Sequence, residues 1–406
     1  MLISATLGIK GLILLCLGLL SAALTFVTNW LALIPWRKTR NQHWTERARA
    51  YYPVRIAATS NIWVVPALLT ITTPLFWPEV SPHWMLIVVV TIVGAILGTI
   101  PMDREVFSRI PFNDLLRQVA LGWLTQFFVW FGFLALIAFM PNRFNLNAMV
   151  LAAVAIVLGV VWIHDGAIRV ARKLGMLLPP PPRLQKIVDD TAARMGVEVR
   201  DVLLMRVSLA QAFAMPHSRR LLFTERLMDL LSDAEIAAVC THELAHLTEA
   251  PSEYYKRYVV WMTFVPWVFV KPMAHTFGAL GVLVLLLTTI LAPLVYRRVS
   301  HKLEVRADRI AHTNEPDAGT YARALARLYE DNLAPAVQAR DHATHPHLYD
   351  RLIAAGMPPD YPRPAAAKSM AWHGRLFAGA IGLVAAFFIL RLPGFISAEK
   401  IQSWFQ

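Results

Sequence analysis

Long uncharged apolar runs divide the chain and predict membrane spans. Runs without Asp, Glu, Lys or Arg occupy residues 11–35, 56–77, 84–101, 119–140, 144–164, 258–270, 276–296 and 376–390. A helix needs about 20 apolar residues to cross a bilayer, so most of these runs are long enough. The runs at 258–270 and 376–390 are shorter, and the first of them contains Pro266. We therefore expect about seven or eight transmembrane helices.

A polar section between the fifth and sixth runs has a mixed pattern. It begins with the proline run 179–182, which predicts a stiff linker. Residues 184–195 have a helical pattern, and strand-like pieces follow at 202–207, 210–215 and 220–223. Ser232 and Glu235 fit a capping box, which predicts that a helix begins there. The expected fold class is a mainly α, polytopic membrane protein with an α+β domain that contains a small β-sheet.

The composition supports a membrane protein and excludes other classes. Of the 406 residues, 56% are hydrophobic and 16% are charged, and the mean hydropathy is +0.48. Soluble domains have about 25% charged residues, so an ordinary globular enzyme and a disordered chain are both excluded. The net charge of +12 indicates basic cytoplasmic loops, and no nucleic-acid partner is expected. Cys16 and Cys240 form no disulfide framework, which favours a reducing compartment.

The loops between the apolar runs predict an orientation in the membrane. The first and third loops are basic, whereas the loop at 78–83 has no Lys or Arg and the loop at 141–147 has Arg143 alone. Because basic loops stay on the cytoplasmic side, the N-terminus is expected outside and the polar section in the cytoplasm. Lys271, in a turn expected at 271–275, then faces outside. No retention signal for the endoplasmic reticulum is evident, so the bacterial inner membrane is favoured.

The helix that follows the capping box contains a pattern typical of a metal site. His242, Glu243 and His246 form the sequence His-Glu-x-x-His. Histidines at positions i and i+4 lie on one helical face, so both imidazoles can reach one metal ion. Glu243 can then take a proton from a water that the metal activates. The alternative is a pair of solvated helix histidines.

A catalytic zinc needs a third protein ligand, and a second predicted helix offers one. Glu304 and Asp308 lie four residues apart on it. Glu304 is expected to complete a two-histidine, one-glutamate site for one zinc ion per chain. Asp308 is expected to accept the second ring N–H of a ligand histidine and to fix its tautomer. Glu249, three residues after His246, is interpreted as a solvated residue at the helix end, with support of the site as the alternative.

These motifs resemble a known family. His242-Glu243-Leu244-Ala245-His246 followed by Glu304-x-x-x-Asp308 is similar to the integral-membrane zinc metallopeptidases that include HtpX and the type 1 CAAX prenyl protease, the family forty-eight metallopeptidases. The order of apolar runs and motifs is also similar. At motif level the resemblance covers roughly residues 170–355. It implies a cytoplasmic, gluzincin-like zinc protease domain.

A strand-like segment resembles the family's substrate-binding strand. Gln211, Ala212 and Phe213 are similar to an edge strand that pairs with the substrate backbone, with Gln211 in place of the usual Asn. The resemblance implies that an extended peptide binds by adding a strand, through main-chain hydrogen bonds. The alternative is an ordinary core strand that carries Phe213.

A later segment resembles the family's His-Pro…Arg element. Thr344-His345-Pro346 and Arg351 match it. The resemblance implies that His345 donates a hydrogen bond to the oxyanion of the reaction and that Arg351 contributes to substrate binding. For His345 the alternative is a residue of a solvated loop.

The expected organisation has five parts. They are an N-terminal membrane bundle of five spans at 1–173, a cytoplasmic catalytic region at 174–257, a hydrophobic hairpin at 258–299, a second cytoplasmic catalytic region at 300–372, and a C-terminal span with its tail at 373–406.

The function expected is a zinc-dependent metalloendopeptidase in the lipid bilayer. Its expected substrates are membrane proteins or membrane-bound peptides, in protein quality control. CAAX-like processing of lipid-attached peptides and a catalytically inactive membrane scaffold are the alternatives. An intramembrane protease is disfavoured because Asp233, Glu235, Glu249 and Glu253 flank the motif. A channel or transporter is disfavoured because the spans lack charged residues. The oligomeric state stays open.

Overall fold

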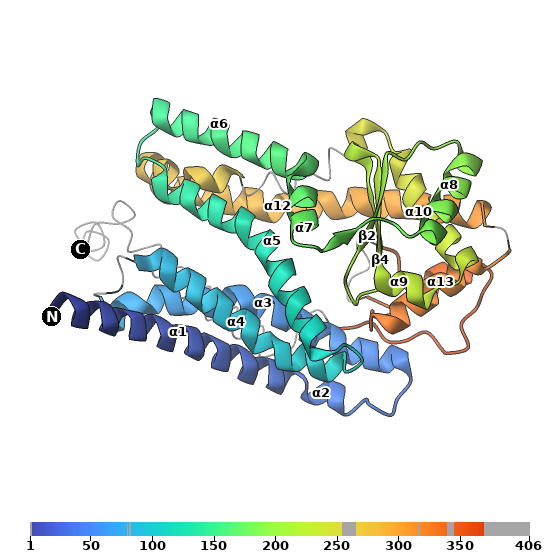
Figure 1. Ribbon diagram of the computed structural model, residues 1–406, viewed down its shortest axis with the longest axis horizontal. Helices are drawn as coiled ribbons and strands as arrows, with labels where there is room; N and C mark the ends of the chain where they lie inside the picture. Colours follow the sequence, from blue (N-terminus) through green and yellow to red (C-terminus); the bar gives the residue numbers. More distant parts are fainter. Residues whose placement is uncertain are drawn as a thin grey trace, which may run out of the picture. The chain divides into compact units, whose positions relative to one another are not determined.

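The computed structural model describes residues 2–78, 80, 83–253, 265–315, 317–338 and 345–368. In this part the chain is mostly helical, with one small mixed sheet (Figure 1). It divides into one compact unit, which comprises the residues up to 119 and those from 367 on, and a second, which comprises residues 120–366. The predicted C-terminal span at 376–390 and residues 258–264 of the sixth apolar run lie outside the described residues.

The first unit is a bundle of long helices. Its elements are α1 (Leu2–Ala32), α2 (Ile34–Arg37), α3 (Trp44–Phe76), α4 (Trp84–Val106) and the first residues of α5 (Phe112–Phe139). A Cβ atom on Gly94 would come within 2.1 Å of the carbonyl oxygen of Gly18, and one on Gly98 within 2.5 Å of that of Ala22. Small residues therefore let the backbones of α1 and α4 approach closely, as is common between membrane helices.

Polar side chains inside this bundle bond across the helices. Asn61 of α3 donates from Nδ2 to Oδ1 of Asn29 on α1, at 2.9 Å. Ser21 of α1 donates to the carbonyl oxygen of Thr91 on α4, at 2.6 Å. Such bonds satisfy polar groups that would otherwise be buried without partners.

Four stretches of the described residues are long and apolar enough to cross a membrane. They are Gly8–Ala32, Trp44–Phe76, Trp84–Val106 and Pro266–Thr289. The helix Leu146–Val161 is apolar but shorter. These stretches indicate a membrane protein, and the larger number of spans expected from the sequence stays a prediction.

The second unit is built around a four-stranded sheet. Its strands are β1 (Leu177–Leu178), β2 (Asp201–Met205), β3 (Ala212–Met215) and β4 (Arg220–Thr224), in the order β1-β2-β4-β3. β2 and β4 are parallel, and the other two pairs are antiparallel. The three longer strands match the predicted pieces to within two residues at each end. β1 was not predicted, because two residues are too few to show an alternating pattern.

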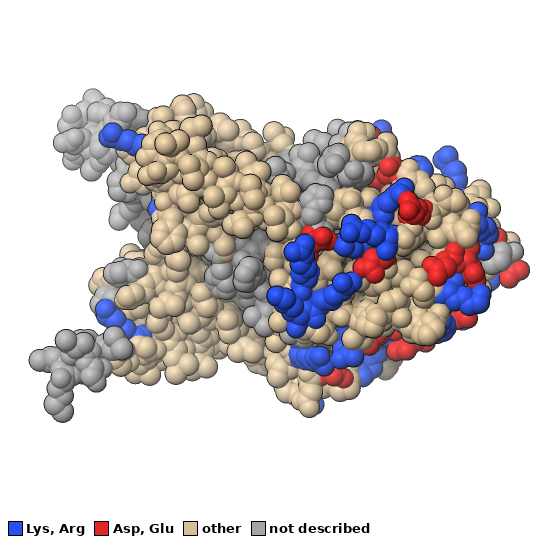
Figure 2. Space-filling view, turned by 45° about the horizontal axis from the view of Figure 1, so that its top comes forward, with Lys and Arg blue, Asp and Glu red and all other residues tan. Residues whose placement is uncertain are grey.

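The other elements of this unit surround the sheet or extend from it. They are the remainder of α5, α6 (Leu146–Val161), the π-helix Trp162–Gly166, α7 (Ala167–Lys173), α8 (Pro182–Met195), the 3₁₀ turn Pro216–Ser218, α9 (Glu225–Leu230), α10 (Asp233–Leu247), the 3₁₀ turn Val265–Phe269, α12 (Val270–Thr313), α13 (Thr320–Asp331) and α14 (Leu348–Ala354). On the face that Figure 2 shows, charged side chains gather over the sheet and its neighbouring helices, and the apolar helices carry few.

The sheet has a hydrophobic layer on each face. One layer packs against α8 and α10, and its strand residues are Val202, Leu204, Leu221 and Phe223. The residues between them, Leu203 and Leu222, pack with Ile168 of α7 on the opposite face. This alternation follows from the period of two along a strand, and it fixes α10 against the sheet.

Both ends of α10 are held by specific bonds. The predicted capping box is confirmed, because the Ser232 hydroxyl accepts from the Glu235 N–H and the Glu235 carboxylate accepts from the Ser232 N–H. At the other end Arg306 of α12 donates to the carbonyl oxygen of Ala245 at 2.9 Å and to the Thr248 hydroxyl at 2.8 Å. α10 is therefore fixed both to the sheet and to α12.

The hydrophobic hairpin reverses later than predicted. Residues 271–275, expected as a turn, are helical, and the non-helical residue is Gly278, with φ 56° and ψ −137°. Nε1 of Trp267 donates to the hydroxyl of Thr289 at 2.7 Å, which a straight helix of this length would not allow. Only glycine adopts such a conformation without strain, so the chain turns back there. After the turn α12 continues without interruption to Thr313.

Candidate metal centre

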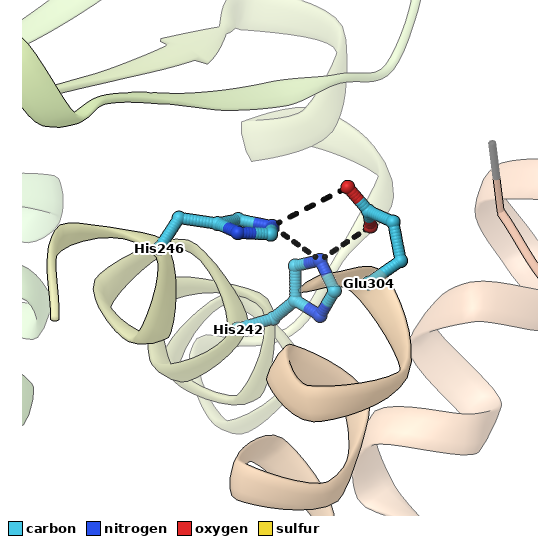
Figure 3. Close-up of side chains that lie close together, drawn as sticks. All are labelled: His242, His246 and Glu304. Atoms are coloured by element: carbon cyan, nitrogen blue, oxygen red, sulfur yellow. Dashed lines mark hydrogen bonds and ion pairs between the residues drawn. The ribbon is translucent and has the colours of Figure 1, made fainter. Parts of the chain in front are cut away.

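The two motif histidines of α10 and Glu304 of α12 converge on one point. Nε2 of His242 lies 3.3 Å from Nε2 of His246 and 3.4 Å from Oε2 of Glu304. Oε1 of Glu304 lies 3.6 Å from Nε2 of His246. All three residues are buried, and their side chains point toward one another (Figure 3). The structure thus brings together the three ligands predicted from the sequence.

The spacing of these three side chains fits a single metal ion. Tetrahedral zinc ligands at about 2.0–2.1 Å from the metal are separated from one another by about 3.3–3.4 Å. The observed separations of 3.3, 3.4 and 3.6 Å are close to that value. Without a cation, two nitrogen lone pairs and a carboxylate would face each other at these distances. Two imidazoles and a carboxylate are also a donor set that zinc accepts, with a fourth position left open.

His246 is supported by a carboxylate from its own helix end. Its Nδ1 lies 2.6 Å from Oε1 of Glu249, whose side chain is 1% exposed. The interpretation of Glu249 as a solvated residue is therefore wrong, and the alternative holds. α10 ends at Leu247, and the next residues turn Glu249 inward onto the imidazole. A carboxylate on the second ring nitrogen is the usual partner of a metal-binding histidine.

His242 is supported by two groups, one of which the sequence did not reveal. Its Nδ1 lies 3.1 Å from Oδ1 of Asp308, as expected, and 2.6 Å from the hydroxyl of Tyr321 on α13. No pattern in the sequence distinguishes Tyr321 from a core residue, because it lies on the buried face of an amphipathic helix. The contact joins residues 79 positions apart.

Arg351 lies behind His242. Its Nη2 donates to Oδ1 of Asp308 at 2.5 Å and to the hydroxyl of Tyr321 at 2.9 Å, and the residue is 7% exposed. The guanidinium therefore holds the two groups that contact Nδ1 of His242. Its contribution to substrate binding stays a prediction.

The carboxylates of the cluster favour the charged form despite their burial. Burial raises the pKa of Glu304, but His242 and His345 more than offset it and hold that pKa well below its usual range. Burial likewise raises the pKa of Asp308, and Arg351 and His242 reverse the shift. For His242, burial lowers the pKa, while Asp308 and Glu304 raise it to about 9. The site thus concentrates negative charge around the point where the ligands meet, which favours a cation.

Glu243 and His345 lie next to the three ligands. Glu243 is buried beside His242 on α10, and none of the described residues forms a hydrogen bond with its carboxylate. Nδ1 of His345 lies 2.9 Å from Oε2 of Glu304, and the side chain is 47% exposed. The structure thus places His345 at the metal centre.

Comparison with known proteins agrees with this geometry. Residues 180–356 match the model of Peptidase family M48. Over these residues the chain is similar to peptidase family M48. The matched region contains every ligand and supporting residue described above, and the family is one of metal-dependent peptidases. The family resemblance predicted from the sequence is confirmed. A search of curated proteins finds no match.

The domain that matches the M48 model has an open strand edge next to α10. β3 pairs only with β4 among the described strands, so its other side is an edge. The Thr224 N–H donates to the carbonyl oxygen of Gln211, so alternation in the ladder turns the main-chain groups of Ala212 and Ala214 toward the open side. Phe213 is 44% exposed, which argues against an ordinary core strand. The predicted substrate-binding segment is thus an edge strand of this domain.

Proposed function

We propose that the protein is a membrane-embedded, zinc-dependent metalloendopeptidase that hydrolyses peptide bonds at the cytoplasmic face. The observation that carries the proposal is the convergence of His242, His246 and Glu304 with separations of 3.3–3.6 Å in a family M48 domain. Basic residues in alternate loops support the cytoplasmic side, and the bacterial inner membrane is the membrane we infer.

The chain supplies the groups that peptide hydrolysis needs. A zinc ion held by His242, His246 and Glu304 would supply a Lewis acid for the scissile carbonyl and for the attacking water molecule. Glu243 takes the proton of that water and passes it to the leaving amine. His345 donates a hydrogen bond to the oxygen of the carbonyl under attack. Glu304 holds the ion together with the two histidines.

The open edge of β3 supports binding of an extended peptide. Main-chain groups of Ala212 and Ala214 can bond to a substrate whatever its side chains are, which suits a protease that acts on many sequences. Apolar helices long enough to cross a bilayer occur in the same chain, which supports a membrane setting for the substrates. We infer that the substrates are membrane proteins or membrane-bound peptides and that the role is protein quality control.

The decisive experiment compares the purified full chain with a Glu243→Gln variant. Wild type should contain about one zinc ion per chain and hydrolyse peptides, as one three-ligand site implies. Glu243→Gln should keep the zinc and lose hydrolysis. Glu198→Gln, an exposed carboxylate of the same domain, is the control and should behave as wild type. Undiminished hydrolysis by Glu243→Gln would reject Glu243 as the base.

The substrate class needs a separate measurement. Cells that express the Glu243→Gln form in place of wild type should accumulate uncleaved membrane proteins, which quantitative proteomics of membranes would identify. Accumulation restricted to lipid-attached peptides would instead support CAAX-like processing. Zinc binding without hydrolysis in wild type would support an inactive scaffold.

A further inference from the structure

Tyr321 contacts His242 at Nδ1, the ring nitrogen that does not face His246 and Glu304. Its side chain is 1% exposed, and its ring stacks on the imidazole of His242, with centroids 5.5 Å apart and 21° between the planes. The hydroxyl lies 2.6 Å from Nδ1 of His242, whereas Asp308 lies 3.1 Å from the same nitrogen. The hydroxyl is therefore the closest partner of this ligand's second nitrogen.

The neighbours of the Tyr321 hydroxyl determine where each proton lies. The oxygen is 2.9 Å from Oδ1 of Asp308 and 2.9 Å from Nη2 of Arg351. A carboxylate only accepts and a guanidinium only donates, so the hydroxyl donates its one proton to Asp308 and accepts from Arg351. Its remaining lone pair can only accept a hydrogen bond. Nδ1 of His242 must therefore carry a proton and donate it.

The opposite assignment leaves unfavourable contacts. If the hydroxyl donated to His242, its oxygen and Oδ1 of Asp308 would face each other at 2.9 Å without a proton between them. The lone pair of Nδ1 would also face that carboxylate at 3.1 Å. Buried polar groups arranged in this way are costly, so only the first assignment satisfies all four groups.

We propose that Tyr321 is a positioning residue that fixes the proton of His242 on Nδ1 and so directs Nε2 to the metal. This inference rests on the proposed function, because it presupposes a metal ion held by His242. The role is specific to one ligand, since Glu249 supports His246 directly. Arg351 and Asp308 hold the hydroxyl in place, and the stacked ring holds the plane of the imidazole.

Zinc affinity of the full-length protein tests the proposal without reference to peptidase activity. Tyr321→Phe removes only the hydroxyl and should weaken zinc binding about 10–100-fold, measured by competition with a chelator of known affinity. Tyr349→Phe on α14, whose ring contacts Tyr361 and Arg363, is the matched control and should bind as wild type. An affinity of Tyr321→Phe within about twofold of wild type, or an equal loss in the control, would overturn the proposal. A wild type that binds no zinc would instead reject the proposed function.

A second measurement needs no variant at this tyrosine. Nitrogen-15 spectra of zinc-loaded wild type with labelled histidine should show Nδ1 of His242 protonated and Nε2 bound to metal. The His242 signals would be assigned by their loss in His242→Asn. Metal on Nδ1 of His242 would overturn the proposal even if Tyr321→Phe does not fold. A purely structural role would lower the thermal midpoint of metal-free Tyr321→Phe and leave the zinc affinity of the folded fraction unchanged.

Discussion

Each ligand histidine has different surroundings at its two ring nitrogens. The Nε2 atoms face Glu304, while Nδ1 of His246 meets Glu249 and Nδ1 of His242 meets Tyr321, both at 2.6 Å. Partners on the second nitrogen orient the imidazole and raise its basicity as a ligand. The geometry of the centre therefore depends on residues that touch no metal.

Loss of the third ligand should release the metal. Glu304→Ala removes the only carboxylate among the three converging side chains, so zinc affinity should fall more than about 100-fold, beyond the effect typical of supporting residues. Zinc per chain after dialysis, measured by atomic absorption, should drop from near one toward zero. Glu243→Gln should retain its zinc in the same assay. Unchanged occupancy in Glu304→Ala would mean that another residue is the third ligand.

The buried cysteine of α10 should be chemically inert. Cys240 is fully buried in the core between the sheet and α10, and this burial raises the pKa of its thiol above the usual range. Because the thiolate is the reactive form, Cys240 should not react with a maleimide in the native protein. Mass spectrometry of a Cys16→Ser variant would detect labelling of Cys240 only after denaturant is added. Rapid labelling without denaturant would contradict the packing of α10.

At the scale of elements, α10 carries two of the candidate metal ligands and β3 offers a strand edge to a peptide. α10 is held by its capping box, by the core and by Arg306, so its histidines have a fixed position. Among the strands that the structure describes, β3 pairs with β4 alone. A rigid helix thus carries the metal site, and an open strand beside it is available for a peptide.

Removal of one outward main-chain donor should weaken hydrolysis. Proline at an edge position whose N–H points outward leaves the ladder intact, so Ala214→Pro should fold. One lost hydrogen bond is worth about 0.5–1.5 kcal/mol, which corresponds to a fall in kcat/KM of about twofold to thirteenfold. Ala214→Val keeps the donor and serves as the control. If Ala214→Pro folds, by circular dichroism, and cleaves peptides as fast as Ala214→Val, the edge does not bind substrate.

At the scale of the whole molecule, metal binding should stabilise the domain. An ion that binds only the folded state contributes about 2.7 kcal/mol at a free concentration 100 times its dissociation constant. A chelator should therefore lower the thermal midpoint of the wild-type chain, and added zinc should restore it. His242→Ala should show no such response. An equal response in that variant would place the stabilising ion elsewhere.

The apolar runs and short motifs were the most predictable features. Among the described residues, the apolar runs at 11–35, 56–77, 84–101, 119–140, 144–164 and 276–296 fall mainly on helices, because the length and composition of a run predict a helix. The spacing of His242 and His246 needs only helical geometry. The capping box at Ser232 was equally local. Each of these features is determined by residues within one or two helical turns.

Features that depend on distant partners were missed. Tyr321 and His242 are 79 residues apart, and nothing local to Tyr321 indicates that contact. Glu249 was misjudged because its burial depends on how the chain turns after α10. The sequence predicts the reversal at 271–275, earlier than its position at Gly278, because Lys271 indicates a polar turn. Its ammonium group instead donates to the carbonyl oxygen of Ala138, at the end of α5.

α12 joins an apolar stretch of the chain to Glu304, one of the three converging side chains. From Tyr296, where the apolar run ends, to Glu304 is eight residues of helix, or about 12 Å. We infer that, in a bilayer whose surface lies at the end of the apolar run, Glu304 stands about 12 Å from that surface. A polypeptide that remains anchored in lipid needs only about four extended residues to reach Glu304. The scissile bonds within reach are then those just outside a membrane segment.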